Sequence, residues 1–145
     1  MKYQVILILA CVVLSMCVTD SSPTSHATVS RQSERGAVEQ IQVVHFHRVH
    51  QCTCCINVGK WAEETIQTHF PAEYEQGTLV YMDLCIEEQP EMARKFNAYG
   101  SSLFINIVRG GEEEITENME VWTYCFDHDA YIDYFRSFLD QILAT

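Results

Sequence analysis

The sequence predicts an α/β domain with a four-stranded mixed sheet and flanking helices, in the order β-α-β-α-β-β-α. Two apolar segments, 41–47 and 79–84, lie on either side of an amphipathic helical segment. This pattern is typical of a parallel β-α-β unit with a right-handed crossover. Two further strand-like segments flank a tight turn at 109–111, as in a β-hairpin. A final helical pattern, which ends near Leu143, supplies a cover for that hairpin.

Length and composition limit the classes of function. The chain has 145 residues, of which 48% are hydrophobic and 20% charged, enough for one domain with a packed core. Its 9 lysines and arginines face 20 acids, giving a net charge of -11. Such a chain repels phosphate backbones, so we expect no nucleic-acid binding. Asp20 and Glu34 are the only acids before residue 38, and we interpret the acidity of the domain as a solvated surface.

Residues 1–17 predict a signal peptide or a lipoprotein leader. The apolar run 5–14 after Lys2 is shorter than the roughly 20 residues of a membrane span. The segment 14–17 resembles a bacterial lipobox and makes Cys17 a candidate for lipidation, although a methionine stands where that pattern prefers a small residue. Cleavage elsewhere and an uncleaved anchor are the alternatives. We expect export to the periplasm or to the outer face of the membrane, with membrane contact only through this leader or a lipid anchor.

Residues 18–37 are rich in serine and almost devoid of large apolar side chains. Such a composition cannot bury enough surface to offset the entropy of ordering the chain. We expect a flexible linker here, of the kind that tethers a domain to a membrane attachment point. The remainder of the chain, 38–145, is the predicted folded domain.

The first strand and the first helix enclose a cysteine-rich turn. Val43, Val44 and Phe46 suit a buried strand that ends before Cys52-Thr53-Cys54-Cys55. Apolar residues then recur at helical spacing until Pro71 ends the helix. The residues that fall on one face of this helix are Val58, Trp61, Ala62, Thr65, Ile66, His69 and Phe70.

The remaining elements follow from turn residues and periodicity. After the strand at 79–84, Pro90 opens a short helix at 91–97. An apolar strand at 102–108 precedes a polar edge strand at 112–117. Asp127 or Asp129 caps the last helix, and we interpret its apolar face as core packing and not as a cofactor site. That face consists of Tyr131, Phe135, Phe138, Leu139, Ile142 and Leu143.

Cys52 and Cys55 have Cys-x-x-Cys spacing at the junction of a strand and a helix. Free amides and the dipole at a helix N-terminus favour the thiolate, which is the form that attacks disulfides. We predict that Cys52 attacks, that Cys55 resolves the mixed disulfide, and that His50 tunes the thiolate. A structural disulfide is an alternative, although cross-linking so short a loop adds little stability.

A metal site is a further interpretation of this segment, because thiolate and imidazole ligands suit copper or zinc. The candidate ligands are Cys52, Cys54, Cys55 and His50. His45 and His47 point to the same face of the first strand, and we expect His45 to pack beneath the helix.

The pairing of the other domain cysteines stays open, since spacing does not determine connectivity. We interpret Cys54 as a helix-start residue, with a bond to Cys52 or a role as third metal ligand as alternatives. We interpret Cys85 and Cys125 as buried free thiols, with a bridge between them as the alternative.

The residues from about Val38 to Leu143 resemble a thioredoxin-like fold. The strand before the cysteines, the strand at 79–83 and the hairpin at 103–111 fall where thioredoxin-like proteins place theirs. Within that superfamily the chain is most similar to the nitrophenyl compound nitroreductase subunit family, the ArsF family. The shared features are Phe46-His47, Trp61-Ala62-Glu63-Glu64 and Ser101-Ser102-Leu103.

The resemblance implies a small exported redox-type domain. We expect this domain to exchange electrons with the cysteines of a partner protein and to hold no organic cofactor. Thioredoxins carry a cis proline before the third strand, which binds substrate backbone and keeps metals off the cysteines. Ser101 and Ser102 occupy that place here, so they are the candidate substrate-binding residues, and the missing proline leaves room for a metal. A copper or zinc module and a non-catalytic accessory subunit of a reductase are the alternative functions, and whether the protein is an enzyme stays open.

Overall fold

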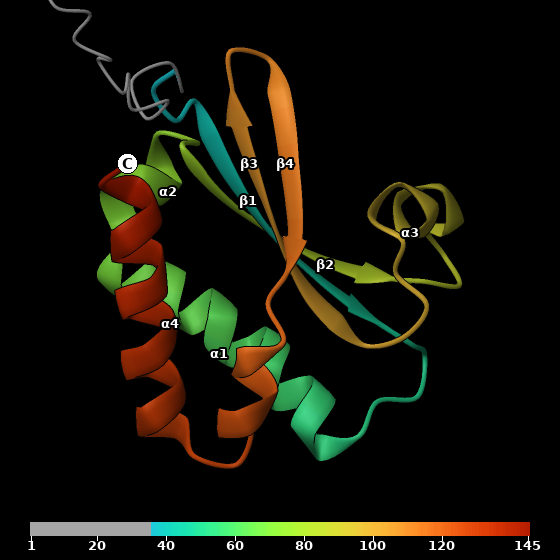
Figure 1. The fold of residues 1–145 in the computed structure, drawn as a ribbon. Helices are drawn as coiled ribbons and strands as arrows, with labels where there is room; N and C mark the ends of the chain where they lie inside the picture. The colour runs from blue at the N-terminus through green and yellow to red at the C-terminus, as the bar shows by residue number, and fades with distance from the viewer. Residues whose placement is uncertain (1–35) are drawn as a thin grey trace, which may run out of the picture. The chain divides into compact units, whose positions relative to one another are not determined.

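A computed structural model describes residues 36–145 as an α/β fold, in which helices flank a four-stranded mixed sheet (Figure 1). Every predicted strand and helix of the domain is present, and the structure adds a short helix, α2, and a 3₁₀ helix, η1. The elements are β1 (Gln40–His47), α1 (Thr53–His69), α2 (Pro71–Glu75), β2 (Leu79–Cys85), α3 (Pro90–Phe96), β3 (Ser102–Arg109), β4 (Glu112–Glu117), η1 (Glu120–Tyr124) and α4 (His128–Leu143).

The strands lie in the order β2-β1-β3-β4, with β1 parallel to β2. β3 runs antiparallel to both β1 and β4. Val43 of β1 pairs with Tyr81 on one side and Ile105 on the other, so the strand before the cysteines is central in the sheet. Gly110 and Gly111 have φ values of 58° and 78° and make the tight turn of the predicted hairpin.

The two faces of the sheet form separate parts of the core. Val43 and Ile105 point to the face that packs against α1 and α4, where Tyr131 and Phe135 are fully buried. The opposite face carries the next residues along the strands, and these pack against residues of α3. Its core consists of Val44, Phe46, Ala93, Phe96, Ala98 and Phe104.

Helix boundaries follow from proline and from capping side chains. α1 ends at His69, and Pro71 then begins α2, because a first helical turn tolerates the missing amide of proline. The sequence pattern indicated Pro71 only as the end of a helix, and α2 was therefore missed. Asp127 caps α4 by accepting a hydrogen bond from the Ala130 amide at 3.2 Å, which confirms the first of the two expected caps.

Predictions for the N-terminal region lie outside the described residues. They are the leader at 1–17, the lipidation of Cys17 and the linker as far as residue 35. Within residues 36–145, the structure contains no helix with the length and apolar character needed to span a membrane.

Candidate functional site

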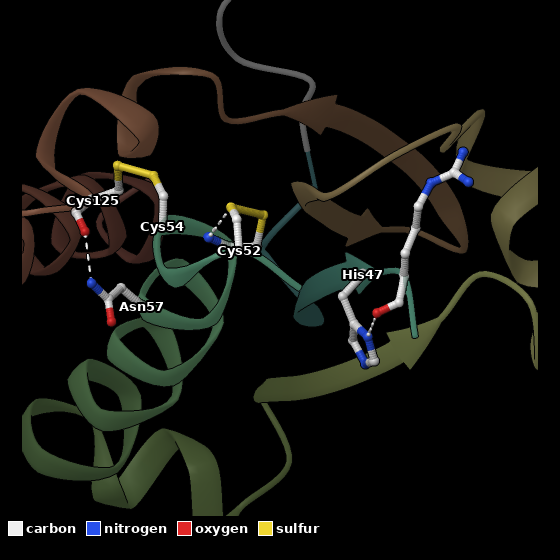
Figure 2. The surroundings of a disulfide bond; sticks show 7 residues. His47, Cys52, Cys54, Asn57 and Cys125 are labelled. Atoms are coloured by element: carbon white, nitrogen blue, oxygen red, sulfur yellow. Dashed lines mark hydrogen bonds between the residues drawn. A yellow bond between two sulfur atoms is a disulfide. The ribbon is translucent and has the colours of Figure 1, made fainter. Parts of the chain in front are cut away.

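A disulfide joins Cys52 and Cys55 at the start of α1 (Figure 2). β1 ends at His47, and a short loop brings the chain to Cys52, which is the N-cap residue of α1 with extended backbone angles, φ -79° and ψ 163°. The Cys52 sulfur accepts a hydrogen bond from the Cys55 amide at 3.1 Å. The predicted cysteine pair therefore lies where it was expected, with one sulfur serving as the helix cap.

The surroundings of Cys52 favour an anionic sulfur. The first turn of α1 contains no acidic residue, so no carboxylate there opposes the positive end of the helix dipole. Cys52 is exposed, whereas Cys55 is half-buried. Cys52 is therefore the more accessible of the two sulfurs, and the roles of attacking and resolving cysteine stay predictions.

A second disulfide joins Cys54 to Cys125, across 71 positions of sequence. This finding corrects the interpretation of Cys54 as a mere helix-start residue and of Cys125 as a free thiol. The Asn57 side-chain amide also donates to the Cys125 carbonyl at 2.9 Å (Figure 2). Both contacts fasten the first turns of α1 to the segment between η1 and α4. Only the fold brings these residues together, so spacing gave no signal of the pairing.

Cys85 is a buried free thiol, and the alternative Cys85–Cys125 bridge is wrong. Cys85 ends the edge strand β2, while Cys125 lies beside α1 and bonds Cys54. The Cys85 thiol donates instead to a Glu87 carboxylate oxygen at 3.3 Å. A bond to its own backbone and this thiol bond together hold the pKa of Glu87 below its ordinary value.

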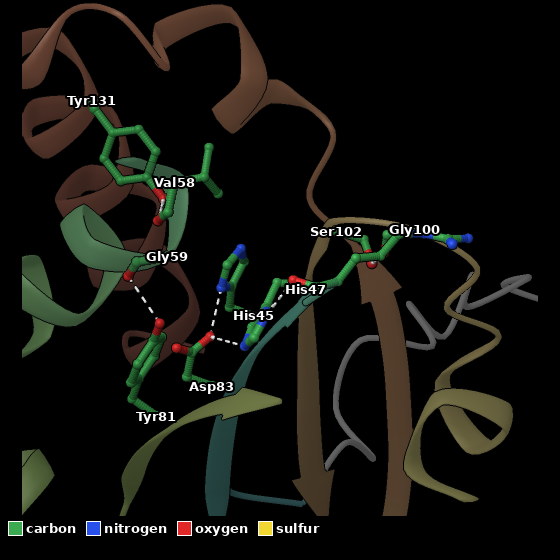
Figure 3. A network of polar contacts seen from close by, with 10 residues as sticks. His45, His47, Val58, Gly59, Tyr81, Asp83, Gly100, Ser102 and Tyr131 are labelled. Carbon is green, nitrogen blue, oxygen red and sulfur yellow. Dashed lines mark hydrogen bonds and ion pairs between the residues drawn. The ribbon is translucent and has the colours of Figure 1, made fainter. Parts of the chain in front are cut away.

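His45 packs beneath α1, as predicted. Its side chain is buried, and its Nδ1 lies 2.7 Å from an Asp83 carboxylate oxygen on β2 (Figure 3). That hydrogen bond lowers the pKa of Asp83. The ring touches Gly59 so closely that a Cβ at position 59 would lie 2.6 Å from its Cε1. Its Nε2 is buried and has no hydrogen-bond partner among the described residues.

Two phenols hold the middle of α1 in place. The Tyr81 hydroxyl donates to the Gly59 carbonyl and the Tyr131 hydroxyl donates to the Val58 carbonyl, each at 2.9 Å (Figure 3). Burial raises the pKa of Tyr81 and Tyr131, so both remain donors at neutral pH. The helix that carries the cysteines is thus tied to β2 and to α4. Helical spacing predicted Tyr131 as a core residue, whereas no pattern in the sequence gave a role to Tyr81.

His50 and the metal interpretation receive no geometric support. His50 is exposed in the loop before Cys52, and no hydrogen bond or ion pair joins its side chain to another of residues 36–145. Cys52, Cys54 and Cys55 are all in disulfides, so they offer no thiolate in this state. In the described part of the chain, no three His, Cys, Asp or Glu side chains are arranged to hold a metal ion.

Ser102 is the first residue of β3, and Ser101 ends the loop before it, where a substrate backbone was expected to bind. Ser101 is half-buried, whereas Ser102 is buried and pairs with Phe46 of β1. The Ser102 hydroxyl donates to the Gly100 carbonyl at 3.1 Å (Figure 3). This hydroxyl is therefore occupied within its own loop, and a substrate contact by either serine stays a prediction.

Comparisons with known proteins give little further information. No protein-family model matches the chain, and no curated protein matches it. A solved structure described as "Structure of a malarial protein" is similar to it with a TM-score of 0.40 and 11% identity, over 66% of this chain and 96% of that chain. A likeness this weak carries no argument about fold or function.

Proposed function

We propose that the protein is a thiol–disulfide exchange protein that uses the Cys52–Cys55 pair. The observation that carries this proposal is an exposed sulfur at a helix N-terminus, held by the amide of the residue that shares its disulfide. When the bond is reduced, the same amide and the helix dipole favour a thiolate at Cys52. A disulfide that closes so short a loop adds only about 2 kcal/mol of stability, so stapling alone is a weak reason for its presence.

The exchange involves two electrons in each direction. A Cys52 thiolate attacks one sulfur of a partner's disulfide, which breaks that bond, forms a mixed disulfide and releases the partner's second sulfur as a thiolate. The Cys55 thiol then loses its proton to solvent and attacks Cys52. This second attack breaks the bond between Cys52 and the partner and re-forms Cys52–Cys55. The two partner sulfurs leave as thiolates and take up protons from solvent to become thiols. In the reverse direction a partner dithiol reduces Cys52–Cys55 by the same steps.

We further propose that the domain is thioredoxin-like. The strand order β2-β1-β3-β4, the parallel β1–β2 pair and the cysteine pair between β1 and α1 support this assignment. The packing of α1 and α4 on one face and α3 on the other is a second support. The similarity to the nitrophenyl compound nitroreductase subunit family stays a prediction.

Export is also a proposal. Disulfides persist in oxidising compartments and are rare where cellular thiols keep proteins reduced. The two disulfides of the domain are therefore in keeping with a periplasmic or surface location, as the predicted leader would require. The partner would then be another exported protein that carries a cysteine pair.

Reduction of a test disulfide by the purified protein, with dithiothreitol as the electron source, tests the proposed exchange. We expect turnover by the wild type, none by Cys52→Ala, and accumulation of a mixed disulfide through Cys52 in Cys55→Ala. A Cys54→Ala/Cys125→Ala variant is the matched control, because it removes the other disulfide and should retain turnover. Equal turnover by Cys52→Ala and the wild type would refute the proposal.

A further inference from the structure

Five large apolar side chains are exposed at the end of the sheet that carries the Cys52–Cys55 disulfide. We call this set the apolar collar. The collar consists of Val49, Ile56, Tyr99, Met119 and Phe126, with exposed fractions of 62%, 50%, 78%, 63% and 78%. Tyr74 on α2 is the other large apolar side chain with marked exposure among the described residues, and α2 lies at the opposite end of the sheet in Figure 1.

The sheet topology places the collar residues at one end. The carboxyl end of β1 pairs with the carboxyl end of β2 and the amino end of β3, since His47 pairs with Cys85 and Phe46 with Ser102. The carboxyl end of β4 meets the same part of β3, where Glu117 pairs with Phe104. Val49 follows β1, Tyr99 precedes β3 and Met119 follows β4. Ile56 lies in the first turn of α1, and Phe126 lies between η1 and α4, next to the Cys125 that is bonded to that turn.

Two collar residues lie beside contacts that fasten their loops to other elements. Phe126 follows Cys125, which is fixed to α1 by the disulfide to Cys54 and by the hydrogen bond from Asn57. The Arg48 guanidinium donates to the Tyr99 carbonyl at 3.0 Å and joins the loop before α1 to the loop before β3. The exposed residues therefore sit on fastened loops. Exposed large apolar side chains on fastened loops around the disulfide are candidates for an interaction site.

Charges around the collar indicate the chemistry of its occupant. Glu117 and Glu120 flank Met119, and Asp127 follows Phe126. Glu117 and Glu120 have no ion-pair partner in residues 36–145, whereas Arg48 on the opposite side faces Glu87 at 4.0 Å. One side of the collar is thus acidic and uncompensated. Complementary charges steer association and fix the orientation of a partner.

We infer that the apolar collar binds a polypeptide segment of the partner, with apolar side chains next to its reactive cysteine and lysine or arginine on the side that meets Glu117 and Glu120. This inference rests on the proposed exchange at Cys52–Cys55 and adds the class of substrate. The Cys54–Cys125 bond would then contribute to binding, because it fixes the loop that carries Phe126.

Exchange rates with three synthetic cysteine peptides test the inference. Each peptide is a symmetric disulfide dimer. The first has leucines beside the cysteine and lysines outside them. The second has glutamates in place of the lysines, and the third has serines in place of the leucines. Glutathione disulfide is the small reference substrate. We expect the protein with Cys52–Cys55 reduced and Cys54–Cys125 intact to react with the leucine–lysine peptide about tenfold faster than with either other peptide. Each of the other peptides lacks either the apolar contacts or the charge attraction, a loss of about 1.4 kcal/mol. This preference over the glutamate peptide should decrease with added salt.

Variants locate the effect on the collar. Ile56→Ser and Phe126→Ser should lower the ratio of the leucine–lysine rate to the glutathione rate about fivefold. Glu120→Gln should reduce the difference in exchange rate between the leucine–lysine peptide and the leucine–glutamate peptide. Tyr74→Ser, at an exposed aromatic at the other end of the sheet, is the matched control and should change neither ratio.

The outcomes separate the inference from the function on which it rests. Equal rates for the three peptides, with normal glutathione exchange, would overturn the inference and leave the proposed function. Failure to react even with glutathione disulfide would overturn both. A dimer in light scattering that Phe126→Ser converts to a monomer would mean that a second copy of the chain covers the collar, and that result also overturns the inference.

Discussion

At the scale of single residues, the position predicted from the sequence agrees best with the structure at Cys52. Its sulfur is the N-cap acceptor of α1, with the Cys55 amide 3.1 Å away. The spacing of the cysteines predicted this arrangement because a helical pattern begins directly after them. The pairing of Cys54 with Cys125 could not be predicted, since it depends on where η1 and α4 pack against α1.

The contact between His45 and Gly59 gives a prediction for stability. A Cβ at position 59 would overlap the buried imidazole, which is fixed by its bond to Asp83 and has little room to move. We expect Gly59→Ala to lower the free energy of unfolding by about 1–3 kcal/mol, measured by urea denaturation. Gly100→Ala is the control, because a Cβ at position 100 would meet no atom within 4 Å. Equal stability of Gly59→Ala and Gly100→Ala would contradict this account.

The bond between His45 and Asp83 predicts a dependence of stability on pH. The bond lowers the pKa of Asp83 in the folded protein. A carboxyl group of this kind contributes stability above its unfolded pKa of about 4 and loses it as the pH falls through the lowered folded value. Wild-type unfolding free energy should therefore decrease more than that of Asp83→Asn between about pH 5 and about pH 2. Parallel curves in acid denaturation would show that the bond contributes nothing.

At the scale of secondary-structure elements, the position of α1 depends on several contacts to distant segments. The disulfide to Cys125 and the Asn57 amide fix its first turns, and hydroxyls from Tyr81 and Tyr131 bind its central carbonyls. Helical spacing predicted the buried face of α1 but none of these bonds, because each one joins residues far apart in sequence. α2 and η1 were missed for a local reason, as short helices have too few turns to show a period.

Loss of the Cys54–Cys125 bond should weaken the fold while leaving the chemistry of the other pair intact. In the chain-entropy model, a cross-link across 71 positions stabilises the folded state by about 4 kcal/mol. We expect a Cys54→Ser/Cys125→Ser variant to unfold at a clearly lower temperature in calorimetry. The same variant should still form and break Cys52–Cys55 reversibly. An unchanged unfolding temperature would mean that packing alone holds α1 against α4.

At the scale of the whole molecule, the order of strands and helices followed from periodicity and turn residues. The apolar segments at β1, β2 and β3 and the glycines at 110 and 111 were sufficient for the four-stranded mixed sheet. The sequence did not reveal the collar, because exposure of an apolar residue depends on how the loops pack. The leader, the lipidation of Cys17 and the partner protein stay predictions.

The acidic surface should influence partner choice at this scale. The chain carries a net charge of -11, and the acids Glu117 and Glu120 lie beside the collar without a cationic partner among residues 36–145. Exchange with basic peptides should therefore slow as ionic strength rises, whereas exchange with glutathione disulfide should not show this loss. Stopped-flow rates at low and high salt measure the difference, and identical salt dependence for both substrates would contradict it.

The central claim is that Cys52–Cys55 is a reversible redox pair within a domain held together by Cys54–Cys125. Equilibration of the purified protein in glutathione buffers, followed by alkylation and peptide mass spectrometry, tests this claim at each cysteine. We predict that Cys52 and Cys55 gain labels together and reversibly, at a potential between about -120 and -270 mV, while Cys54 and Cys125 stay unlabelled. The claim would be contradicted if Cys54 and Cys125 were labelled before Cys52 and Cys55. It would also be contradicted if Cys52 and Cys55 were labelled only after the protein unfolds.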